Sequence, residues 1–270
     1  MKNTFWYNNN LPFVEARAVE DGHKFCFDKH SHETLSIGII RQGRARFYNR
    51  GKTVEIGSGE VTVMNPGDVH ACNPIATSPW SYLMFHVDVD WFETLNETSE
   101  TAIQSIFEFT ESVGSTPKLF TRFTELYEIL IRPDVNCLEK EIAMIESFTE
   151  LVDIFGTRRR LPPSDSDRLV IAARFIRDNW DRKLGLSEIC TASGLSASYL
   201  TRSFRQRFGM TPYAYLINHR IQEARYMLRN GLSIADVAHE ALFFDQAHFQ
   251  RAFKRLTAVN PGAFVHSLRG

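Results

Sequence analysis

Long hydrophobic runs and closely spaced cysteines are both missing from this chain. None of its 270 residues belong to an apolar stretch near the roughly 18–20 needed to span a bilayer, and the first residues lack a signal peptide's apolar core. The 4 cysteines lie far apart without CxxC spacing, which argues against a disulfide framework or a zinc ribbon. These absences favour a protein of the reducing cytoplasm with no membrane segment.

The composition is that of a globular protein with uneven charge. Hydrophobic residues make up 43% and charged residues 23%, which excludes a disordered chain, a collagen-like fibre and a coiled-coil rod. The net charge is only −1, yet residues 165–270 carry 15 Lys and Arg against 9 Asp and Glu. A basic C-terminal part beside an acidic N-terminal part suggests that one domain binds a polyanion.

Two kinds of hydrophobic periodicity divide the chain. Up to about residue 90, short alternating stretches, such as Phe25 with Phe27 and Val61 with Val63, predict many short strands in a sandwich or barrel. The segment from Gly156 to Asp165 combines a glycine, three arginines and a double proline, as is typical of a linker. We therefore expect an α+β multidomain fold at about 150 residues per domain. Its parts are a β-barrel with appended helices over 1–156, a linker over 157–166 and an all-α domain over 167–270.

One apolar stripe before the linker has two interpretations. Its members recur every three or four residues, which predicts a helix of roughly five turns, and they are Leu138, Ile142, Ile145, Phe148, Val152 and Phe155. The stripe can pack on the barrel as part of its core. It can equally pair with its own copy in a homodimer, because the spacing also suits a short helical seam.

The C-terminal part contains an internal repeat. Residues 200–205 match residues 249–254, and residues 211–216 match residues 260–265, at an offset of 49. Each unit predicts a short helix, a tight turn and a second helix, with N-caps at Ser187, Ser196, Ser233 and Asp245. A helix opened by Pro212 and running over 213–229, ~27 Å long, joins the units. Two second helices held this way could enter major-groove segments ~34 Å apart.

The second helix of each unit is predicted to contact DNA with its outward face. In the first unit Tyr199, Leu200, Phe204 and Phe208 are expected to be buried, and in the second Phe249 and Phe253. Small polar residues at a helix start, followed by basic ones, suit contacts to base edges and phosphates. The candidate DNA-binding residues are Ser198, Thr201, Arg202, Arg205, Gln246, Ala247, Gln250, Arg251 and Lys254.

These motifs resemble the DNA-binding domain of AraC/XylS-type transcription regulators. The stretches that carry the resemblance are Gly194-Leu195-Ser196, Gly209-Met210-Thr211-Pro212, residues 233–238 and residues 245–255. The resemblance implies two helix-turn-helix units joined by a long helix, which bind double-stranded promoter DNA and regulate, often activate, transcription. RNA polymerase is then a candidate partner. Two departures stand out in the second unit: Leu242 where the family has Gly, and Leu256-Thr257-Ala258 where it has a bulky aromatic residue and a Gly. They predict a rebuilt or strained turn and a looser end of the second recognition helix.

Histidines mark the N-terminal part. His30-Ser31-His32, followed by residues 59–70 ending in Pro66-Gly67-Asp68-Val69-His70, resembles the two motifs of cupin barrels found in the sensor domains of the same family. The glutamate of metal-binding cupins is missing, since Ser36 and Ile37 stand where it is expected.

The role of these histidines has three interpretations. They can hold a divalent metal ion, line a pocket for a small organic effector, or be satisfied structurally. The resemblance favours an effector pocket without a cofactor or metal, lined by His30, His32, His70, Trp80, Tyr82 and Met84. Trp80, Tyr82, Met84 and His86 share one face of the predicted strand 80–87, which can also be ordinary core or the outer face.

The function that follows is regulation of transcription rather than catalysis. We expect a homodimeric regulator whose barrel senses a small molecule and whose C-terminal helices bind promoter DNA. Two alternatives stay open from the residues: a metal-dependent cupin enzyme tethered to DNA, and a regulator whose barrel only dimerises. The missing glutamate argues against the enzyme.

Overall fold

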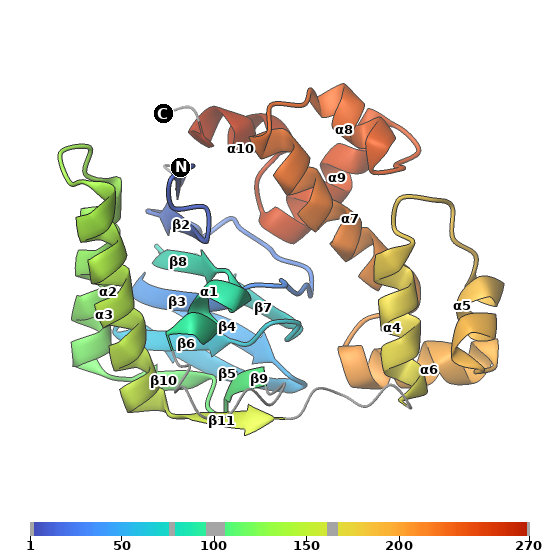
Figure 1. The fold of residues 1–270 in the computed structure, drawn as a ribbon, viewed down its shortest axis with the longest axis horizontal. Coiled ribbons are helices and arrows are strands. Elements are labelled where there is room, and N and C mark those ends of the chain that lie inside the picture. The colour runs from blue at the N-terminus through green and yellow to red at the C-terminus, as the bar shows by residue number, and fades with distance from the viewer. Residues whose placement is uncertain (1–2, 76–78, 96–105, 161–166, 269–270) are drawn as a thin grey trace. The chain divides into compact units, whose positions relative to one another are not determined.

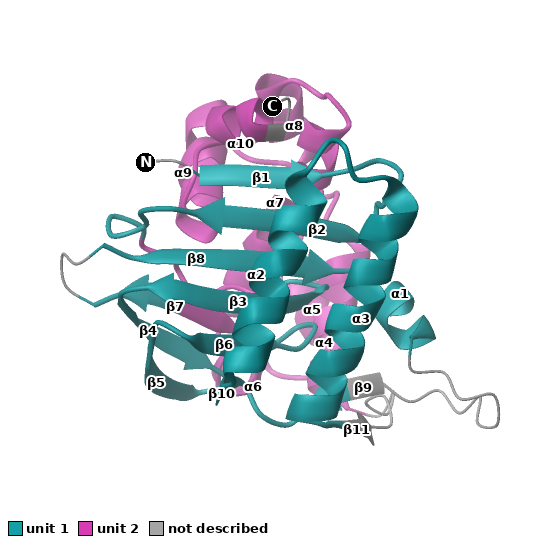
Figure 2. Ribbon diagram, turned by 90° about the vertical axis from the view of Figure 1, so that its left-hand side faces the viewer, with its two compact units in different colours: residues 1–25, 32–68, 72–162 teal, residues 26–31, 69–71, 163–270 magenta. Residues whose placement is uncertain are grey.

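The computed structural model describes residues 3–75, 79–95, 106–160 and 167–268. By compactness the chain divides into two units, which Figure 2 colours separately. Unit 1 comprises residues 1–25, 32–68 and 72–162, and unit 2 comprises residues 26–31, 69–71 and 163–270. No helix in the described residues is both long and apolar enough to cross a membrane.

The N-terminal part is built of β-strands, in a six-stranded and a three-stranded sheet. The six-stranded sheet has the order β1-β2-β8-β3-β6-β10, from β1 (Asn3–Tyr7), β2 (Val14–Val19), β8 (Ser81–Val87), β3 (Leu35–Gln42), β6 (Glu60–Met64) and β10 (Val113–Ser115). The three-stranded sheet orders β5 (Lys52–Gly57), β4 (Arg44–Asn49) and β7 (His70–Pro74). Val61 and Val63 lie in β6 as predicted, whereas Phe25 and Phe27 lie outside any strand.

Two consecutive helices, α2 (Pro117–Ile131) and α3 (Cys137–Phe155), cover one face of the six-stranded sheet (Figure 2). Alternate residues of the strands point to this face, so β3 contributes Ile37 and Ile39 while β8 contributes Leu83 and Phe85. They pack with apolar side chains of the two helices, among them Phe148, in one core cluster. The short helix α1 (Val89–Thr94) adds Phe92 to the same core.

The apolar stripe of α3 is divided between core and surface. Phe148 is fully buried, whereas Leu138 is 66% exposed, Ile142 46% and Ile145 38%. The core side of the helix is instead completed by Met144 and Leu151, which the stripe did not include. The first two turns of the stripe therefore do not belong to the core of this chain.

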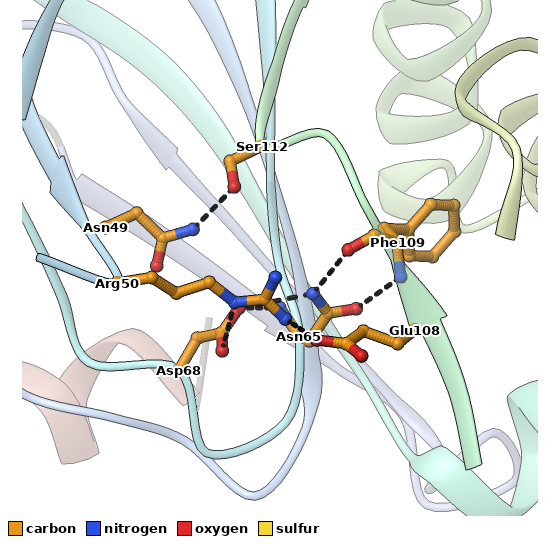
Figure 3. Close-up of polar contacts among 7 residues, drawn as sticks. All are labelled: Asn49, Arg50, Asn65, Asp68, Glu108, Phe109 and Ser112. Carbon is orange, nitrogen blue, oxygen red and sulfur yellow. Dashed lines mark hydrogen bonds and ion pairs between the residues drawn. The ribbon is translucent and has the colours of Figure 1, made fainter. Parts of the chain in front are cut away.

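A polar network fastens the β4–β5 turn to strand β9 (Ile106–Phe109) (Figure 3). Arg50 adopts a left-handed φ of 48°, and its guanidinium pairs with the carboxylates of Asp68, at 2.7 Å, and Glu108. Burial lowers the pKa of Arg50, but the two carboxylates outweigh it, so the pKa is raised overall. Asn65 exchanges hydrogen bonds with the backbone of Phe109, at 2.7 and 3.0 Å.

Strand β9 in turn pairs with β11 (Thr157–Arg160), antiparallel. These four residues were expected to open the linker, and they instead continue the β-structure beyond α3. The polar network around Arg50 therefore anchors β9, the strand on which β11 pairs, and residues 161–166 lie outside the described part.

The C-terminal part is all-α and repeats as predicted (Figure 1). Its helices are α4 (Arg168–Asp178), α5 (Leu186–Ser193), α6 (Ala197–Phe208), α7 (Pro212–Arg229), α8 (Ile234–Glu240), α9 (Gln246–Thr257) and α10 (Pro261–Leu268). Ser196, Ser233 and Asp245 accept a hydrogen bond from a backbone N–H of the first turn, which confirms three of the predicted caps. The prediction for Ser187 was wrong, because α5 begins at Leu186 after Gly185.

Two residues of the second unit adopt the left-handed conformation that glycine normally supplies. Leu242, in the turn between α8 and α9, has φ 54°, and Ala258, after α9, has φ 60°. The turn therefore keeps a left-handed conformation despite its leucine. The helix end is not loosened either, because Ala258 N–H still bonds to Lys254 and Thr257 Oγ1 donates to the carbonyl of Phe253 at 2.8 Å.

Candidate functional site

The outward face of α6 forms a shallow groove of about 600 Å³. The four residues predicted from the sequence to contact DNA in this unit all line it: Ser198, Thr201, Arg202 and Arg205. They are exposed, whereas Leu200 and Phe204 on the opposite side of the helix are fully buried. Sequence reasoning placed Tyr199 with the buried residues, and this was wrong, because it is 49% exposed. It missed Leu186, Ala197 and Thr211, which complete the groove.

The same division recurs on α9. Phe249 and Phe253 are fully buried, with ring centroids 5.6 Å apart. The predicted contact residues of this helix are all exposed, namely Gln246, Ala247, Gln250, Arg251 and Lys254. Helical periodicity explains why the two sets separate, since residues three and four apart share a face.

The basic residues on the outward faces of α6 and α9 form no ion pairs within the described part of the chain. Among the described residues, no carboxylate pairs with Arg202, Arg205, Arg251 or Lys254. By contrast, Arg207 of α6 lies off the groove and pairs with Asp167 at 2.6 Å. Uncompensated cations on an exposed helix face suit a polyanionic partner.

A buried arginine of α7 joins the two helix-turn-helix units. Arg220 is 6% exposed, and its guanidinium donates to the backbone carbonyls of Trp180 and Arg182 before α5, each at 2.9 Å. A third hydrogen bond of 3.2 Å reaches the carbonyl of Leu242, in the turn before α9. Burial lowers the pKa of Arg220, and the three carbonyl dipoles take the place of a carboxylate partner.

The face of the six-stranded sheet opposite α2 and α3 carries buried polar side chains. Strand pairing sets Arg17 beside Met84, and Met84 beside Gly38, which in turn faces Thr62. In the neighbouring row, Glu15 is beside His86 and His86 is beside Ser36, whose Oγ lies 2.9 Å from the His86 Nδ1. Glu15, Arg17, Ser36 and Thr62 are each at most 6% exposed. A sheet face lined this way offers hydrogen-bonding groups away from bulk water.

The predicted aromatic residues lie in this part of unit 1. Tyr82 is in β8 on the same face as Met84, while Trp80 precedes the strand, which begins at Ser81 rather than at residue 80. The Trp80 and Tyr82 rings are 4.7 Å apart, and burial raises the pKa of Tyr82 to about 12. The Trp80 indole is 1% exposed, and its N–H has no hydrogen-bond partner among the described residues.

The predicted histidines form two local pairs. His30 and His70 are joined as an isolated β-bridge, with N–O distances of 3.0 and 2.8 Å and ring centroids 4.5 Å apart. The ring of His32 lies 4.5 Å from that of His86. His30 and His70 belong to unit 2, and His32 and His86 belong to unit 1, so each pair lies within one unit.

The charged residues of the sheet face were missed by sequence reasoning. Glu15 and Arg17 alternate with small apolar residues in β2, a pattern that normally predicts a strand with one solvent-facing side. Their burial is visible only once the strand is central, between β1 and β8. Asn3 Oδ1 accepts a hydrogen bond from Arg17 Nε at 2.8 Å, and the rings of Phe5 and Phe25 flank the guanidinium.

Known proteins share both halves of this architecture. Residues 13–144 match the family model described as an AraC-like ligand binding domain, and residues 189–267 match a helix-turn-helix domain model. The HTH-type transcriptional regulator YbfI of Bacillus subtilis is 27% identical over 224 residues, 82% of this chain and 81% of that protein. The arabinose operon regulatory protein of Escherichia coli is 25% identical, over 85% and 79% of the two chains.

A solved structure gives the same fold over the whole chain. Wild-type ToxT from Vibrio cholerae, with an unsaturated fatty acid bound, aligns with a TM-score of 0.62 at 14% identity, over 99% of this chain and 98% of that one. The likeness extends over both the β-rich and the helical part. With its ligand-binding and helix-turn-helix models in one chain, the protein belongs to the AraC family of DNA-binding transcription regulators.

Proposed function

We propose that α6 and α9 recognise a specific promoter sequence by presenting their outward faces to the major groove. One observation carries the proposal: the nine residues selected from the sequence as DNA contacts are all exposed, while Phe204, Phe249 and Phe253 on the same two helices are fully buried. Arg202 and Arg251 occupy matching positions in the two units and are proposed to reach base edges. Such a role places the protein with its promoters, in the cytoplasm.

The test is selection of binding sites from a random DNA pool by the full chain. We expect enriched sequences with two specific blocks about one helical turn apart, one for each unit. Arg207→Ala is the matched control, because Arg207 lies on the same helix but outside the groove, and it should select the same sequences as the wild type. A pool that shows no enrichment would contradict sequence-specific binding.

We also propose that the polar sheet face of unit 1 binds a small organic effector. Trp80, Tyr82 and Met84 would supply contact surface, and the Trp80 N–H, which has no partner among the described residues, would donate to an acceptor atom of the ligand. ToxT, which shares the fold, was solved with a bound unsaturated fatty acid, in keeping with a ligand for this domain type. His30, His32 and His70 are proposed as further hydrogen-bonding contacts rather than metal ligands.

Effector binding is tested by screening small metabolites for thermal stabilisation of the full chain. Trp80→Phe keeps an aromatic ring and removes the N–H. The variant should therefore bind the stabilising metabolite more weakly, while its DNA binding in the absence of the metabolite stays unchanged. Replacing His32 and His70 by Ala should abolish the effector's influence on DNA binding. About one equivalent of zinc, nickel or iron in protein purified without a His tag, lost in this double variant, would favour the metal interpretation instead.

Dimerisation through α3 completes the proposal. Leu138, Ile142 and Ile145 expose an apolar strip that the core of the chain does not use, and a second copy of the same helix would bury it. Ile142→Glu with Ile145→Glu should therefore give folded monomers that bind one site weakly and lose avidity at paired sites. Light scattering that still shows a dimer would contradict this seam. RNA polymerase remains the candidate partner through which bound protein would act on transcription.

A further inference from the structure

One large apolar side chain of the helical part faces solvent almost completely. Phe244 is 91% exposed, more than any other exposed large hydrophobic residue of the described chain. It lies directly before Asp245, the residue that caps α9 by accepting a hydrogen bond from His248 N–H at 2.6 Å. The exposed phenyl ring therefore stands at the N-terminal end of the second recognition helix.

The side chain of Phe244 does not pack in the core of the helical part. An apolar residue before an N-cap often packs against the fourth residue of the helix, which here is Phe249. That place is taken by Phe243, which is 7% exposed and whose ring centroid lies 5.2 Å from that of Phe249. Phe244 is consequently free of the hydrophobic contact that would explain a phenylalanine at its position.

The backbone that carries Phe244 is held firmly. Leu242 N–H bonds to His239 O at 2.9 Å, Phe243 N–H bonds to Ala238 O at 3.0 Å, and Leu242 O accepts from the buried Arg220. With Asp245 fixed as the cap on the other side, both neighbours of Phe244 are anchored. Its ring is presented from a rigid turn, which limits the entropy lost when it contacts a partner.

We infer that Phe244 contacts the 5-methyl group of a thymine in the major groove. This rests on the proposed function, in which the N-terminal residues of α9 approach base edges. The thymine methyl is the apolar group displayed in that groove, and phenylalanine is among the side chains that contact it. Two of the exposed residues that follow, Asp245 and Gln246, are polar, so the ring does not continue into an apolar stretch at the start of α9.

The test replaces thymine by deoxyuridine, which lacks only the methyl group. In a sequence selected by the full chain, each thymine of the block read by α9 is exchanged singly. We expect one exchange to weaken wild-type binding about fourfold, as for the loss of one buried methyl. Phe244→Ser should bind the thymine DNA about as weakly as the wild type binds the uridine DNA, and it should no longer distinguish the two. Tyr226→Ser, at a residue of α7 that is 63% exposed, is the matched control and should behave as wild type.

Two results would overturn the inference, and a third separates it from the proposed function. The methyl contact is excluded if the wild-type protein binds thymine and deoxyuridine DNA equally well at every position of the block. It is also excluded if Phe244→Ser still binds the deoxyuridine DNA about fourfold more weakly than the thymine DNA. If Arg251→Ala weakens binding while Phe244→Ser does not, only this inference is wrong. If Arg251→Ala and Arg202→Ala also leave affinity unchanged, the proposed DNA-binding surface itself is wrong.

Discussion

The two helix-turn-helix units have the same backbone geometry but reach it with different residues. The turn before α6 contains Gly194 at φ 64°, and the matching turn before α9 contains Leu242 at φ 54°. After the recognition helices the pair is Gly209 at φ 70° and Ala258 at φ 60°. The left-handed positions are thus requirements of the motif, which glycine meets without strain and an L side chain meets at a cost of ~1–2 kcal/mol.

The difference teaches that neighbouring contacts can hold a conformation that the local sequence disfavours. Leu242 is fixed from both sides, by its own N–H to His239 and by Arg220 at its carbonyl. Gly194 also bonds its carbonyl to an arginine, Arg168, at 3.1 Å, but that residue is more exposed. The first unit relies on glycine's freedom, and the second relies on the buried guanidinium of α7.

The largest expected effect comes from removing that guanidinium. Arg220→Met fills a similar volume but leaves three partly buried carbonyls without their donor, so we expect a loss of about 3 kcal/mol in the free energy of unfolding of the helical part. Arg220→Lys keeps the charge, cannot span all three acceptors and should lose less. Denaturant unfolding followed by helix circular dichroism measures both. If Arg220→Met is as stable as the wild type, the turn between α8 and α9 keeps its conformation without the hydrogen bond from Arg220.

Base contacts of the two units can be compared directly. Arg202→Ala and Arg251→Ala should each cost about 1–3 kcal/mol in specific DNA binding if each arginine reaches a base edge, and each should relax the preference at its own block only. Both side chains are exposed, so the thermal unfolding temperature should not change. Binding titrations on the selected sequence, with single-base variants in either block, give the comparison. A loss confined to Arg202→Ala would show that the second unit adds little specificity.

Exchanging the turn residues should shift stability in opposite directions. Gly194→Leu places a side chain at φ 64°, where the surroundings leave space, so we expect it to destabilise by about 1–2 kcal/mol through backbone strain alone. Leu242→Gly should stabilise by less than about 1 kcal/mol, because relief of strain is partly offset by glycine's greater freedom in the unfolded chain. Differential scanning calorimetry of the two variants measures the pair. A destabilised Leu242→Gly would mean that the leucine side chain contributes more by packing than it costs in strain.

The smallest effect is expected for Lys254, the predicted phosphate contact. Lys254→Ala should weaken binding to every sequence alike and reduce the slope of log affinity against log salt by about 1. Lys183→Ala, which removes a lysine of the helical part outside both recognition helices, is the control and should leave the slope unchanged. A sequence-dependent loss at Lys254 would instead indicate a base contact.

The sequence predicted the helical part well because its determinants are local. Caps such as Ser196 and Asp245, and apolar residues spaced by three and four, define helices and their buried faces without knowledge of the rest of the chain. Tyr199 was misplaced because it adjoins the buried Leu200, and periodicity alone leaves the edge of a helix face ambiguous. Arg220 gave no signal, since an arginine in an amphipathic helix normally faces solvent.

The β-rich part was predicted only as a class. Which strands pair depends on contacts between distant segments, so neither the central place of β2 nor the burial of Glu15 and Arg17 follows from local alternation. The histidine motifs did indicate residues that come together, with His30 bridged to His70. The stripe of α3 was ambiguous for a physical reason, because core packing and self-association use the same spacing, and the helix divides its stripe between core and surface.

Arg220 has a further consequence for the DNA that the protein can accept. A guanidinium hydrogen-bonded to the backbone before α5 and to the turn before α9 leaves the two recognition helices little freedom to move apart. One base pair inserted between the two blocks would displace the second by ~3.4 Å and rotate it by ~35° around the duplex. With the separation of the two recognition helices fixed, the number of base pairs between the two blocks would matter for affinity as much as the bases within them.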